Sequence, residues 1–455
     1  MQQVNLGMLG GGTVGSGVFH AWQQNGELMA ARLGVNTAFR KIAVKAFDEP
    51  RPYPIPRSLM TTDWQEVVND PQVHVVIELV GGTGIARTMV LAALALGKTV
   101  VTANKALLSA HGPELFAAAA KSGANLYYEA SVCGGIPIIK SLREGFVANQ
   151  FPAIYGIVNG TCNYILTRMK LEGADFADVL AEAQKQGYAE TPPDLDIDGK
   201  DAQHKIGVLA SLAHGFWVKH EEIHTEGIRD VSKIDMQFAQ QLGYTIKLLG
   251  IVKQIDDSQS PTANRAHRTA RKSKVVKRKS GVQVSVYPTL IPNSHVLASV
   301  NGVFNACFVR GDVVGDTLFY GRGAGKDATA SAVLSDVADA ALDLKNGTRL
   351  RVPPFVPHAA KGRVVPMDEI VSQYYVRFDV VDRPGVLAKI AAIFAAARIG
   401  ISSVIQPEGH EGESVPLIMM IHDATNAAMC KALAKIAKLP VVKGKPVMFR
   451  VENLE

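Results

Sequence analysis

The chain has 455 residues and a formal net charge of +6. This length predicts roughly two to four domains with ample core. No apolar run reaches the length of a membrane span, so we do not expect a membrane protein. No signal peptide is apparent at the start, and the four cysteines show neither metal nor disulfide spacing; we therefore expect a cytoplasmic protein with reduced thiols.

The first predicted element is a strand that leads into a glycine motif. Residues 4–9 are mostly apolar, Gly10-x-Gly12-x-x-Gly15 follows, and a helical pattern starts at Thr13. The first glycine permits a tight turn, the second lets the backbone approach a pyrophosphate, and the third lets the helix pack closely on the strand. A dinucleotide-binding motif requires this order of strand, glycines and helix. The residues predicted to bind the cofactor here are Gly10, Gly12, Thr13, Val14 and Gly15.

Alternating strands and helices continue and predict a Rossmann domain over residues 1–150. The further strands are expected at residues 41–47, 73–82, 98–105 and 124–132. Lys105 stands at the C-terminal end of the fourth strand. Because open α/β sheets bind their ligands at the carboxyl ends of their strands, Lys105 is also a predicted cofactor-side residue.

Residues around the second strand bear on the choice of cofactor. The adenosine ribose is usually read there; a cation favours the 2′-phosphate of NADP, whereas an acidic residue favours NAD. Arg40, Lys41 and Lys45 supply cations, and Asp48 lies slightly beyond them. Because both cations and an acid are present, the pattern favours NADP only slightly, with Lys45 as the cation for its 2′-phosphate, and NAD remains an alternative. Lys45 is equally well interpreted as a solvated surface charge.

A second domain is predicted over residues 151–325, where the pattern changes to a mixed sheet with helices. Strands are expected at residues 153–161, 282–291, 294–300 and 302–311, and helices at residues 161–172, 175–187 and 199–213. Thr161, which follows Gly160, is the expected N-cap of the first helix. A helix near residues 325–345 is expected to return to the first domain.

A charged segment, residues 191–205, precedes a helix that should be buried. It reads TPPDLDIDGKDAQHK, and residues 206–213 are apolar on nearly all sides, which indicates a helix that enters the core. Asp201 and Lys205 are four residues apart and share one face of this helix. A lysine at the polar end of a buried helix suggests a role toward a small polar substrate. An Asp–Lys pair with no other context is more often an exposed surface pair.

Several segments together resemble the homoserine dehydrogenase family. In chain order they are GGGTVGSGV, VVTANKALLS, YEASVCGGIPII, VNGTCNYIL, GYAETPPDLDIDGKDAQHK, GVFNACF and FYGRGAG, and they extend over nearly the whole first 350 residues. The resemblance implies reduction of L-aspartate 4-semialdehyde to L-homoserine with NADH or NADPH, a step in the biosynthesis of threonine, methionine and isoleucine. The rival functions are a dehydrogenase of a related amino-acid aldehyde and a sensor that binds nucleotide and amino acid without turnover.

The same resemblance implies roles for individual residues. Lys205 resembles the family's proton-donating lysine, which also stabilises the alkoxide that forms when hydride reaches the aldehyde carbon. Asp201 is expected to fix Lys205 or to share in substrate binding, and Lys105 resembles a second active-site lysine near the nicotinamide. Glu190 is expected to hold the ammonium group of the substrate. The other substrate-side positions are Asp196, Gly160 and Thr161.

The segment EASVCGGIP resembles the family's monovalent-cation loop. The resemblance implies a sodium ion held by the carboxylate of Glu129 and by the backbone carbonyls of Val132, Gly134 and Ile136, since oxygen ligands suit a hard cation. An ordinary Gly-Gly turn into a helix has the same local pattern.

The last segment, residues 372–455, is predicted to form a separate ferredoxin-like βαββαβ domain. Its strands are expected at residues 373–380, 401–406, 415–421 and 446–451, and its helices at residues 386–398 and 424–437. The expected apolar face of the first helix is Leu387, Ile390, Phe394 and Ala397. The chain as a whole is then α/β, with a Rossmann domain, an α+β substrate and dimerisation domain, and this C-terminal domain.

Residues 376–406 resemble an ACT domain, a module that commonly binds amino acids and dimerises. The resemblance implies either an effector site near Gly385, with threonine as the candidate effector, or a dimerisation module without a ligand. It also implies a homodimer or a homotetramer, and the sequence does not choose between these sizes.

The positive charge is concentrated in residues 264–280, which hold eight Lys and Arg and no acid. Such a run is expected to be a long exposed loop, most simply an inert insertion. The alternative is an arm that attracts anions, either NADPH or a polyanionic partner. The run has no aromatic side chain to stack on a base, so specific nucleic-acid binding is not expected.

Overall fold

The computed structural model describes residues 1–255, 281–348, 351–359, 362–407 and 414–454. The basic segment 264–280 lies outside these ranges. The chain divides into two compact units. Unit 1 comprises Met1–Val158, His204–Glu221 and Phe304–Gly362, and unit 2 comprises Asn159–Gln203, Glu222–Val303 and Arg363–Glu455. Each unit is therefore assembled from three separate stretches of the chain.

Unit 1 contains a six-stranded parallel sheet with the strand order β3-β2-β1-β4-β5-β6. The strands are β1 Gln2–Leu9, β2 Val35–Ala43, β3 Met60–Thr61, β4 Val75–Glu78, β5 Thr99–Thr102 and β6 Leu126–Tyr127. This order is that of a Rossmann-like sheet, in which the strand order reverses between β1 and β4. The predicted Rossmann class of the N-terminal part is thus confirmed.

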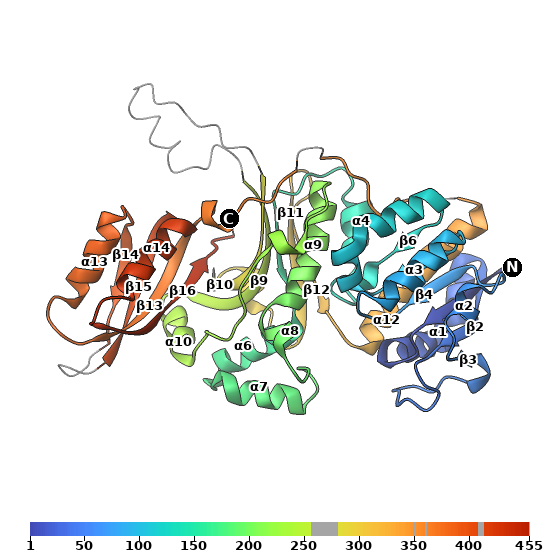
Figure 1. Ribbon diagram of the computed structural model, residues 1–455, viewed down its shortest axis with the longest axis horizontal. Helices are drawn as coiled ribbons and strands as arrows, with labels where there is room; N and C mark the ends of the chain where they lie inside the picture. Colours follow the sequence, from blue (N-terminus) through green and yellow to red (C-terminus); the bar gives the residue numbers. More distant parts are fainter. Residues whose placement is uncertain (256–280, 349–350, 360–361, 408–413, 455) are drawn as a thin grey trace, which may run out of the picture. The chain divides into compact units, whose positions relative to one another are not determined.

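Helices cover both faces of this sheet (Figure 1). They are α1 Thr13–Leu33, the short α2 Gln65–Val68, α3 Ile85–Ala95, α4 Lys105–Ser122 and α12 Lys326–Asn346. α1 and α12 pack on one face, and α3 and α4 lie on the other. α12 belongs to the last stretch of unit 1, and its Ala330, Val333 and Val337 are buried in the same core as the β1 side chains Leu6 and Met8. The core of the nucleotide-binding sheet therefore needs residues from both ends of this unit.

The strand β2 begins and ends earlier than predicted, because its pairing with β1 determines where it starts and stops. It pairs in parallel with β1 along its length, and the two strands end together, with Leu9 opposite Ala43. β2 occupies residues 35–43 rather than the expected 41–47. Lys45 consequently lies beyond the carboxyl end of the strand, at the sheet edge where ligands bind.

Three antiparallel strands and part of a long helix complete unit 1. The strands are β7 Ala153–Ile157, β11 Phe304–Gly311 and β12 Gly315–Arg322, in the order β12-β11-β7. β12 was not predicted; its residues alternate only between exposed and half-buried, and none is fully buried, so the strand leaves a weak hydrophobic signal in the sequence. The helix α9 Lys200–His214 carries residues of both units.

Unit 2 is built on the antiparallel pair β9 Tyr244–Ile255 and β10 Gly281–Pro292. Its helices before the C-terminal stretch include α6 Gly160–Glu172, α7 Phe176–Lys185, α8 Asp194–Ile197 and α10 Lys233–Gln241. The strand predicted at residues 294–300 is instead a 3-10 helix, Val296–Ser299, because the His295 ring accepts a hydrogen bond from the Leu297 N–H and caps it. Within the described ranges, no helix is both long and apolar enough to cross a membrane.

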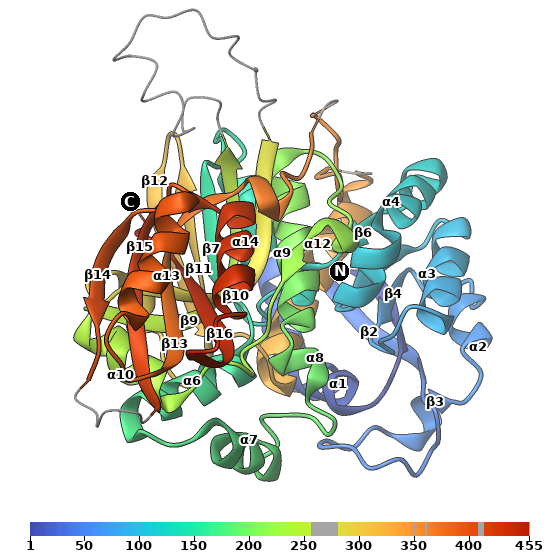
Figure 2. The ribbon, with the colours of Figure 1, turned by 60° about the vertical axis from the view of Figure 1, so that its left-hand side comes forward.

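The C-terminal stretch of unit 2 has the predicted βαββαβ order. Its elements are β13 Val371–Val381, α13 Val386–Ala396, β14 Ile401–Ile405, β15 Ser414–Thr425, α14 Asn426–Ile436 and β16 Val442–Val451, with the sheet order β16-β13-β15-β14. Both helices pack on one face of these strands (Figure 2). On α13, Ile390 and Phe394 are buried as expected, whereas Leu387 and Ala397 are exposed and Val386 is buried.

Strand pairing and buried charges tie this C-terminal stretch to the rest of unit 2. β16 pairs in parallel with β10. Arg377 Nε donates to Asp235 at 2.8 Å, Tyr375 Oη donates to the same carboxylate at 2.9 Å, and Asp235 is fully buried. Arg450, only 1% exposed, forms two hydrogen bonds of 2.9 Å with Glu226. The acids of one stretch thus have their counter-charges in the other.

Candidate active site

The glycine motif forms an open cradle at the carboxyl end of β1. Gly10 has a φ of +102°, and a side chain there would meet the Leu79 carbonyl oxygen at 2.7 Å. A Cβ at Gly15 would lie 2.0 Å from the Gly10 carbonyl oxygen, so only glycine lets α1 approach the strand this closely. Gly12 faces open space and directly precedes α1, which begins with the predicted contacts Thr13 and Val14. The turn, the open backbone and the helix N-terminus are the features that bind a pyrophosphate.

A cavity of about 410 Å³ opens at this cradle. Its lining includes Gly10, Gly11, Gly12, Lys45, Glu49 and Val80. Of the three predicted cations, Lys45 is the one that lines the cavity. The Lys41 ammonium instead contacts Glu66 at 2.5 Å, and Arg40 lies 4.0 Å from Asp70. Lys45 is therefore the predicted cation at the cavity, whereas Lys41 and Arg40 are paired with acids elsewhere.

Glu78, which the sequence did not single out, shapes the loop beside this cavity. It ends β4 and is fully buried. Its carboxylate accepts the N–H groups of Val80 and Gly81 at 2.8 and 3.2 Å and the hydroxyl of Thr102 at 2.6 Å. An acid at the end of a strand that is otherwise apolar is the only local signal for this role.

Lys105 begins α4 at the carboxyl end of β5, as predicted, and is half-buried. The preceding Asn104 caps the helix, because its side-chain oxygen accepts the Leu107 N–H at 3.0 Å. Its side-chain nitrogen donates to the Gly82 carbonyl at 2.7 Å. Asn104 thereby links the start of α4 to the loop after β4, at the same edge of the sheet as the glycine cradle. Asparagine before a helix is a recognisable cap, which is a signal that the sequence offered.

Lys205 is buried in α9. Its side chain is 7% exposed, and its Nζ donates to the Val158 carbonyl oxygen at 2.8 Å. The apolar run that follows is buried as predicted, with Ile206 and Leu209 fully covered. Asp201 is half-buried one turn earlier on the same helix. A lysine placed in this way loses most of its hydration and depends on polar protein groups.

Asn159 brings two of the predicted aspartates together within unit 2. It directly precedes α6 and is 4% exposed. Its Nδ2 donates to Asp196 at 2.8 Å and to Asp201 at 3.0 Å. Its Oδ1 accepts the Cys162 N–H at 2.7 Å and so caps the helix. Asn159 lies within the segment VNGTCNYIL, where no local pattern predicted this role.

Thr161 is not the helix cap that was expected, because Asn159 takes that position and α6 begins at Gly160. The Thr161 hydroxyl instead donates to the Tyr188 carbonyl at 2.6 Å. Tyr188 lies two residues before Glu190, whose side chain is exposed. The first turn of α6 therefore holds the segment that carries Glu190, within unit 2.

Asp194 and Asp198 stand at the two ends of α8 and both bind Arg229. The structure therefore gives both acids a structural role, because they form ion pairs with the same arginine. The Arg229 Nη2 also lies 3.1 Å from the second carboxylate oxygen of Asp198. Asp196, which lies between them on α8, instead accepts the hydrogen bond from the Asn159 side chain. Neighbouring acids of one short helix thus have separate partners.

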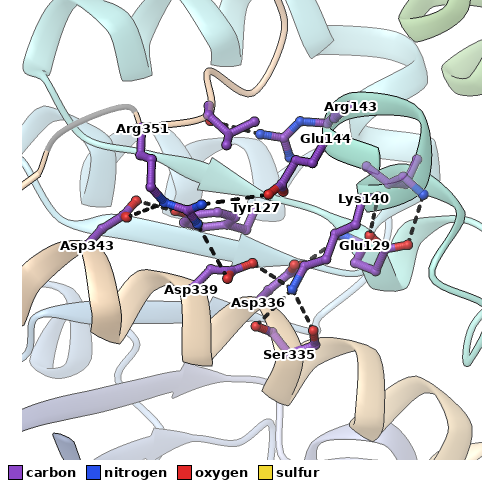
Figure 3. Close-up of polar contacts among 12 residues, drawn as sticks. Tyr127, Glu129, Lys140, Arg143, Glu144, Ser335, Asp336, Asp339, Asp343 and Arg351 are labelled. Carbon is purple, nitrogen blue, oxygen red and sulfur yellow. Dashed lines mark hydrogen bonds and ion pairs between the residues drawn. The ribbon is translucent and has the colours of Figure 1, made fainter. Parts of the chain in front are cut away.

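Glu129 lies in a buried polar cluster of unit 1 (Figure 3). Its two carboxylate oxygens accept the N–H groups of Ile139 and Lys140 at 2.9 and 2.7 Å, and its own N–H donates to Asp336 at 2.8 Å. The Lys140 ammonium contacts Asp339 at 2.6 Å. Burial raises the pKa of Glu129 to about 7, although the two N–H bonds and Lys140 oppose this shift.

The predicted cation loop fits a small cation in its chemistry. Within the described chain, no group of three or more His, Cys, Asp or Glu side chains could hold a metal ion. A cation here would rely on the Glu129 carboxylate and on backbone carbonyls, which are the ligands that the resemblance implies. The Ile136 carbonyl already accepts the Ile138 N–H at 2.8 Å, but an oxygen has two lone pairs. A cation would also favour the charged form of a buried carboxylate.

Comparison with known proteins identifies the family. The model described as "Homoserine dehydrogenase" matches residues 137–338, and "Homoserine dehydrogenase, NAD binding domain" matches residues 10–129. The homoserine dehydrogenases of Pseudomonas aeruginosa and Neisseria gonorrhoeae are 40% and 41% identical to this chain, with 100% of both chains covered in each case. The crystal structure of a homoserine dehydrogenase from Thiobacillus denitrificans matches with a TM-score of 0.89 at 40% identity, covering 100% of this chain and 99% of that one.

The glycine cradle on a Rossmann-like sheet and the matching NAD-binding domain define an oxidoreductase that uses a nicotinamide cofactor. The family match over residues 137–338 and the full-length similarity to the two relatives then identify the family of this oxidoreductase. The chain belongs to the homoserine dehydrogenase family.

Proposed function

We propose that this chain reduces L-aspartate 4-semialdehyde to L-homoserine with Lys205 as the proton donor. The observation that carries the proposal is a buried ammonium group, bonded to a backbone carbonyl and one helical turn from Asp201. When bound, the nicotinamide cofactor supplies the hydride. The Lys205 ammonium stabilises the negative charge that develops on the aldehyde oxygen and transfers a proton to it.

The remaining predicted residues divide the other tasks. Asp201 and Asp196 bind or orient the substrate, and Glu190 pairs with its ammonium group. Lys105, at the carboxyl end of β5, adds a second cation on the cofactor side. An assay with aspartate semialdehyde and either NADPH or NADH tests the activity. Competition by a homologous amino-acid aldehyde with a higher kcat/KM would instead favour the rival dehydrogenase, and absence of turnover would favour the sensor.

Replacement of Glu190 by Ala is expected to raise the KM for homoserine by about tenfold or more and to change kcat only a few-fold. The reason is that a charge-assisted bond to an ammonium group acts on the bound substrate before and during reaction alike. Steady-state kinetics of homoserine oxidation measures both constants. Asp178→Ala, at an exposed position of α7, is the matched control. An unchanged KM in Glu190→Ala would remove the residue from substrate binding.

Lys45 is proposed to favour NADPH over NADH, because it is the predicted cation that lines the cavity at the glycine cradle. Glu49 in the same lining supplies the opposite sign. A complex of a hyperthermophilic archaeal homoserine dehydrogenase with NADPH matches this chain with a TM-score of 0.59 at 26% identity, over 75% of this chain and 98% of that one. The NADPH bound to that relative supports the proposal.

Lys45→Ala is expected to lower kcat/KM for NADPH by about tenfold and to leave kcat/KM for NADH nearly unchanged, since only NADPH offers a 2′-phosphate to the ammonium group. Lys41→Ala serves as the control, because the Lys41 ammonium contacts Glu66. The measurement is the ratio of the two kcat/KM values for each variant. Equal losses with both cofactors would show that Lys45 does not distinguish them.

A monovalent cation, sodium by the resemblance, is proposed at the loop that contains Glu129. Its ligands are the Glu129 carboxylate and the carbonyls of Val132, Gly134 and Ile136. The burial of Glu129 and its raised pKa support this, because a buried carboxylate gains most from a cation. The loop lies directly before the short helix Ile138–Lys140, and its Glu129 carboxylate accepts the N–H groups of Ile139 and Lys140.

The C-terminal βαββαβ stretch is proposed to be an ACT domain that regulates the enzyme by binding an amino acid, with threonine as the candidate effector near Gly385. A homodimer or homotetramer fits the same proposal. The order of its strands supports the ACT assignment. This activity would place the enzyme in the biosynthesis of threonine, methionine and isoleucine, where feedback by threonine is chemically reasonable because the product is its precursor.

A further inference from the structure

The Asn159 carboxamide donates two hydrogen bonds through its nitrogen and accepts one through its oxygen. The two N–H bonds of Nδ2 go to different elements, one to Asp196 on α8 and one to Asp201 on α9. The oxygen caps α6 through the Cys162 N–H. One buried side chain thus joins the starts of two helices to the middle of a third.

The two carboxylates need such a bridge because they carry the same charge. Each has an oxygen within 3.0 Å of one nitrogen atom, so the two groups are held close together. Like charges at this range repel each other more strongly away from water. An amide is well suited to the position, since it donates two hydrogen bonds and brings no net charge that would neutralise an acid needed for the substrate.

Asn159 is itself held on a rigid base. Asn163, one turn along α6, donates to the carbonyls of Val300 and Gly302 at 3.1 and 3.0 Å. The buried Lys247 ammonium donates to the Asn163 side-chain oxygen at 3.0 Å and also to the Val300 carbonyl. These bonds fix the first turns of α6 against the segment before β11. A bridge on a fixed base can set the positions of its two acids closely.

We propose that Asn159 is a positioning residue for the reaction: it sets the separation and direction of the Asp196 and Asp201 carboxylates. The inference rests on the proposed function, in which these two aspartates face the substrate. Asn159 itself is not assigned a contact with substrate or cofactor. Its effect is transmitted through the two acids, so its loss should act mainly on the step that needs both of them in place.

Asn159→Asp separates this role from helix capping. Aspartate has the same shape and is an equally good N-cap, so its oxygen still accepts the Cys162 N–H. It lacks the N–H donors, however, and adds a third negative charge beside two others. We expect kcat/KM to fall by about a hundredfold or more near pH 8, since two charge-assisted hydrogen bonds are lost. Circular dichroism and the urea midpoint should show a folded protein.

The pH dependence gives the decisive readout. A protonated carboxyl group at position 159 regains one donor, so the activity of Asn159→Asp relative to the unmodified enzyme should rise as the pH is lowered. Asn159→Ser, which keeps a capping oxygen but cannot bridge the acids, should lose activity to the same extent at every pH. A loss in Asn159→Asp whose ratio to the unmodified enzyme is constant with pH would overturn the proposal, as would wild-type kcat/KM in both variants.

Asp196→Asn and Asp201→Asn distinguish the two levels of failure. If these variants lose activity while Asn159→Asp does not, the positioning role is wrong and the proposed function stands. If both aspartate variants keep full kcat/KM, the roles assigned to the acids are wrong and the inference about Asn159 falls with them. Reduced activity in all three, with pH-dependent recovery only in Asn159→Asp, is the result that the structure leads us to expect.

Discussion

Lys205→Ala should fold, bind NADPH and lose most of its turnover, with kcat reduced by about 10²–10⁴-fold. General acid catalysis by a positioned side chain contributes a factor of this size, and loss of the stabilising charge lowers the rate further. The fold should survive because the substitution removes a buried polar group and leaves apolar neighbours such as Ile206 in place. Stopped-flow and steady-state kinetics with aspartate semialdehyde measure the loss, and titration of NADPH fluorescence measures cofactor binding.

Two further variants sharpen this test. Lys205→Arg keeps a positive charge but does not release its proton at usable pH, so it should retain more substrate affinity than Lys205→Ala and still turn over slowly. Lys200→Ala, at the exposed start of the same helix, should behave like the unmodified enzyme. Turnover of Lys205→Ala within a few-fold of the unmodified enzyme would exclude Lys205 as the proton donor.

Arg377→Met is expected to lower the free energy of unfolding by about 3–5 kcal/mol, because it leaves a buried carboxylate without its counter-charge. The partner is Asp235, which is 0% exposed, and Arg377 itself is 12% exposed. Tyr375 still donates to this carboxylate, so the lower part of the range is expected. Urea unfolding followed by circular dichroism measures the change. A loss below 1 kcal/mol would mean that the Asp235 carboxylate does not depend on Arg377 as its counter-charge.

Lys445→Met provides the matched control for Arg377→Met. Lys445 and Asp230 form an ion pair 3.7 Å apart, in which the C-terminal stretch again supplies the cation and the preceding stretch the acid. Unlike Arg377 and Asp235, their side chains are 86% and 74% exposed. Exposed pairs contribute about 0–1 kcal/mol, so this variant should unfold almost like the unmodified protein. The contrast isolates the effect of burial from that of charge.

The same contacts revise an expectation about truncation. From the sequence, a chain that ends near Pro366 should keep dehydrogenase activity and lose any feedback by threonine. In the structure, this truncation removes β16 from β10 and takes Arg377 and Arg450 from their acids. We therefore expect the truncated chain to be poorly folded, and point variants near Gly385 are the better test of an effector site.

The parts of the fold that could be predicted depend on local sequence. The glycine motif could be predicted because its three glycines, only a few residues apart, form a recognisable pattern. The structure shows Gly10 and Gly15 at close backbone contacts. The βαββαβ order of the tail was found because its periodicity changes from strand to helix over short segments. The limits of β2 were missed, since they depend on pairing with β1 rather than on its own residues.

The parts that could not be predicted depend on residues far apart in the chain. Asn159 meets Asp196 and Asp201 across 37 and 42 positions, and no local pattern states that these side chains converge. The sequence gives no sign that Asp235 is buried against Arg377, because the two residues are 142 positions apart. Family resemblance supplied candidate site residues, but the contacts that hold them in place come from the folded chain.

The parallel pairing of β10 with β16 has a consequence for the order of events during synthesis. β16 (Val442–Val451) is synthesised long after β10 (Gly281–Pro292), so unit 2 stays incomplete until this last strand of the sheet has been made. At about 5–20 residues per second, Asp235 emerges on the order of ten seconds before Arg377 does. During this interval Asp235 lacks its counter-charge Arg377, and Thr289 and Leu290 of β10 lack their partner strand β16. Newly made chains should therefore be most exposed to proteases and to aggregation in unit 2, and the last step of folding waits for the final strand.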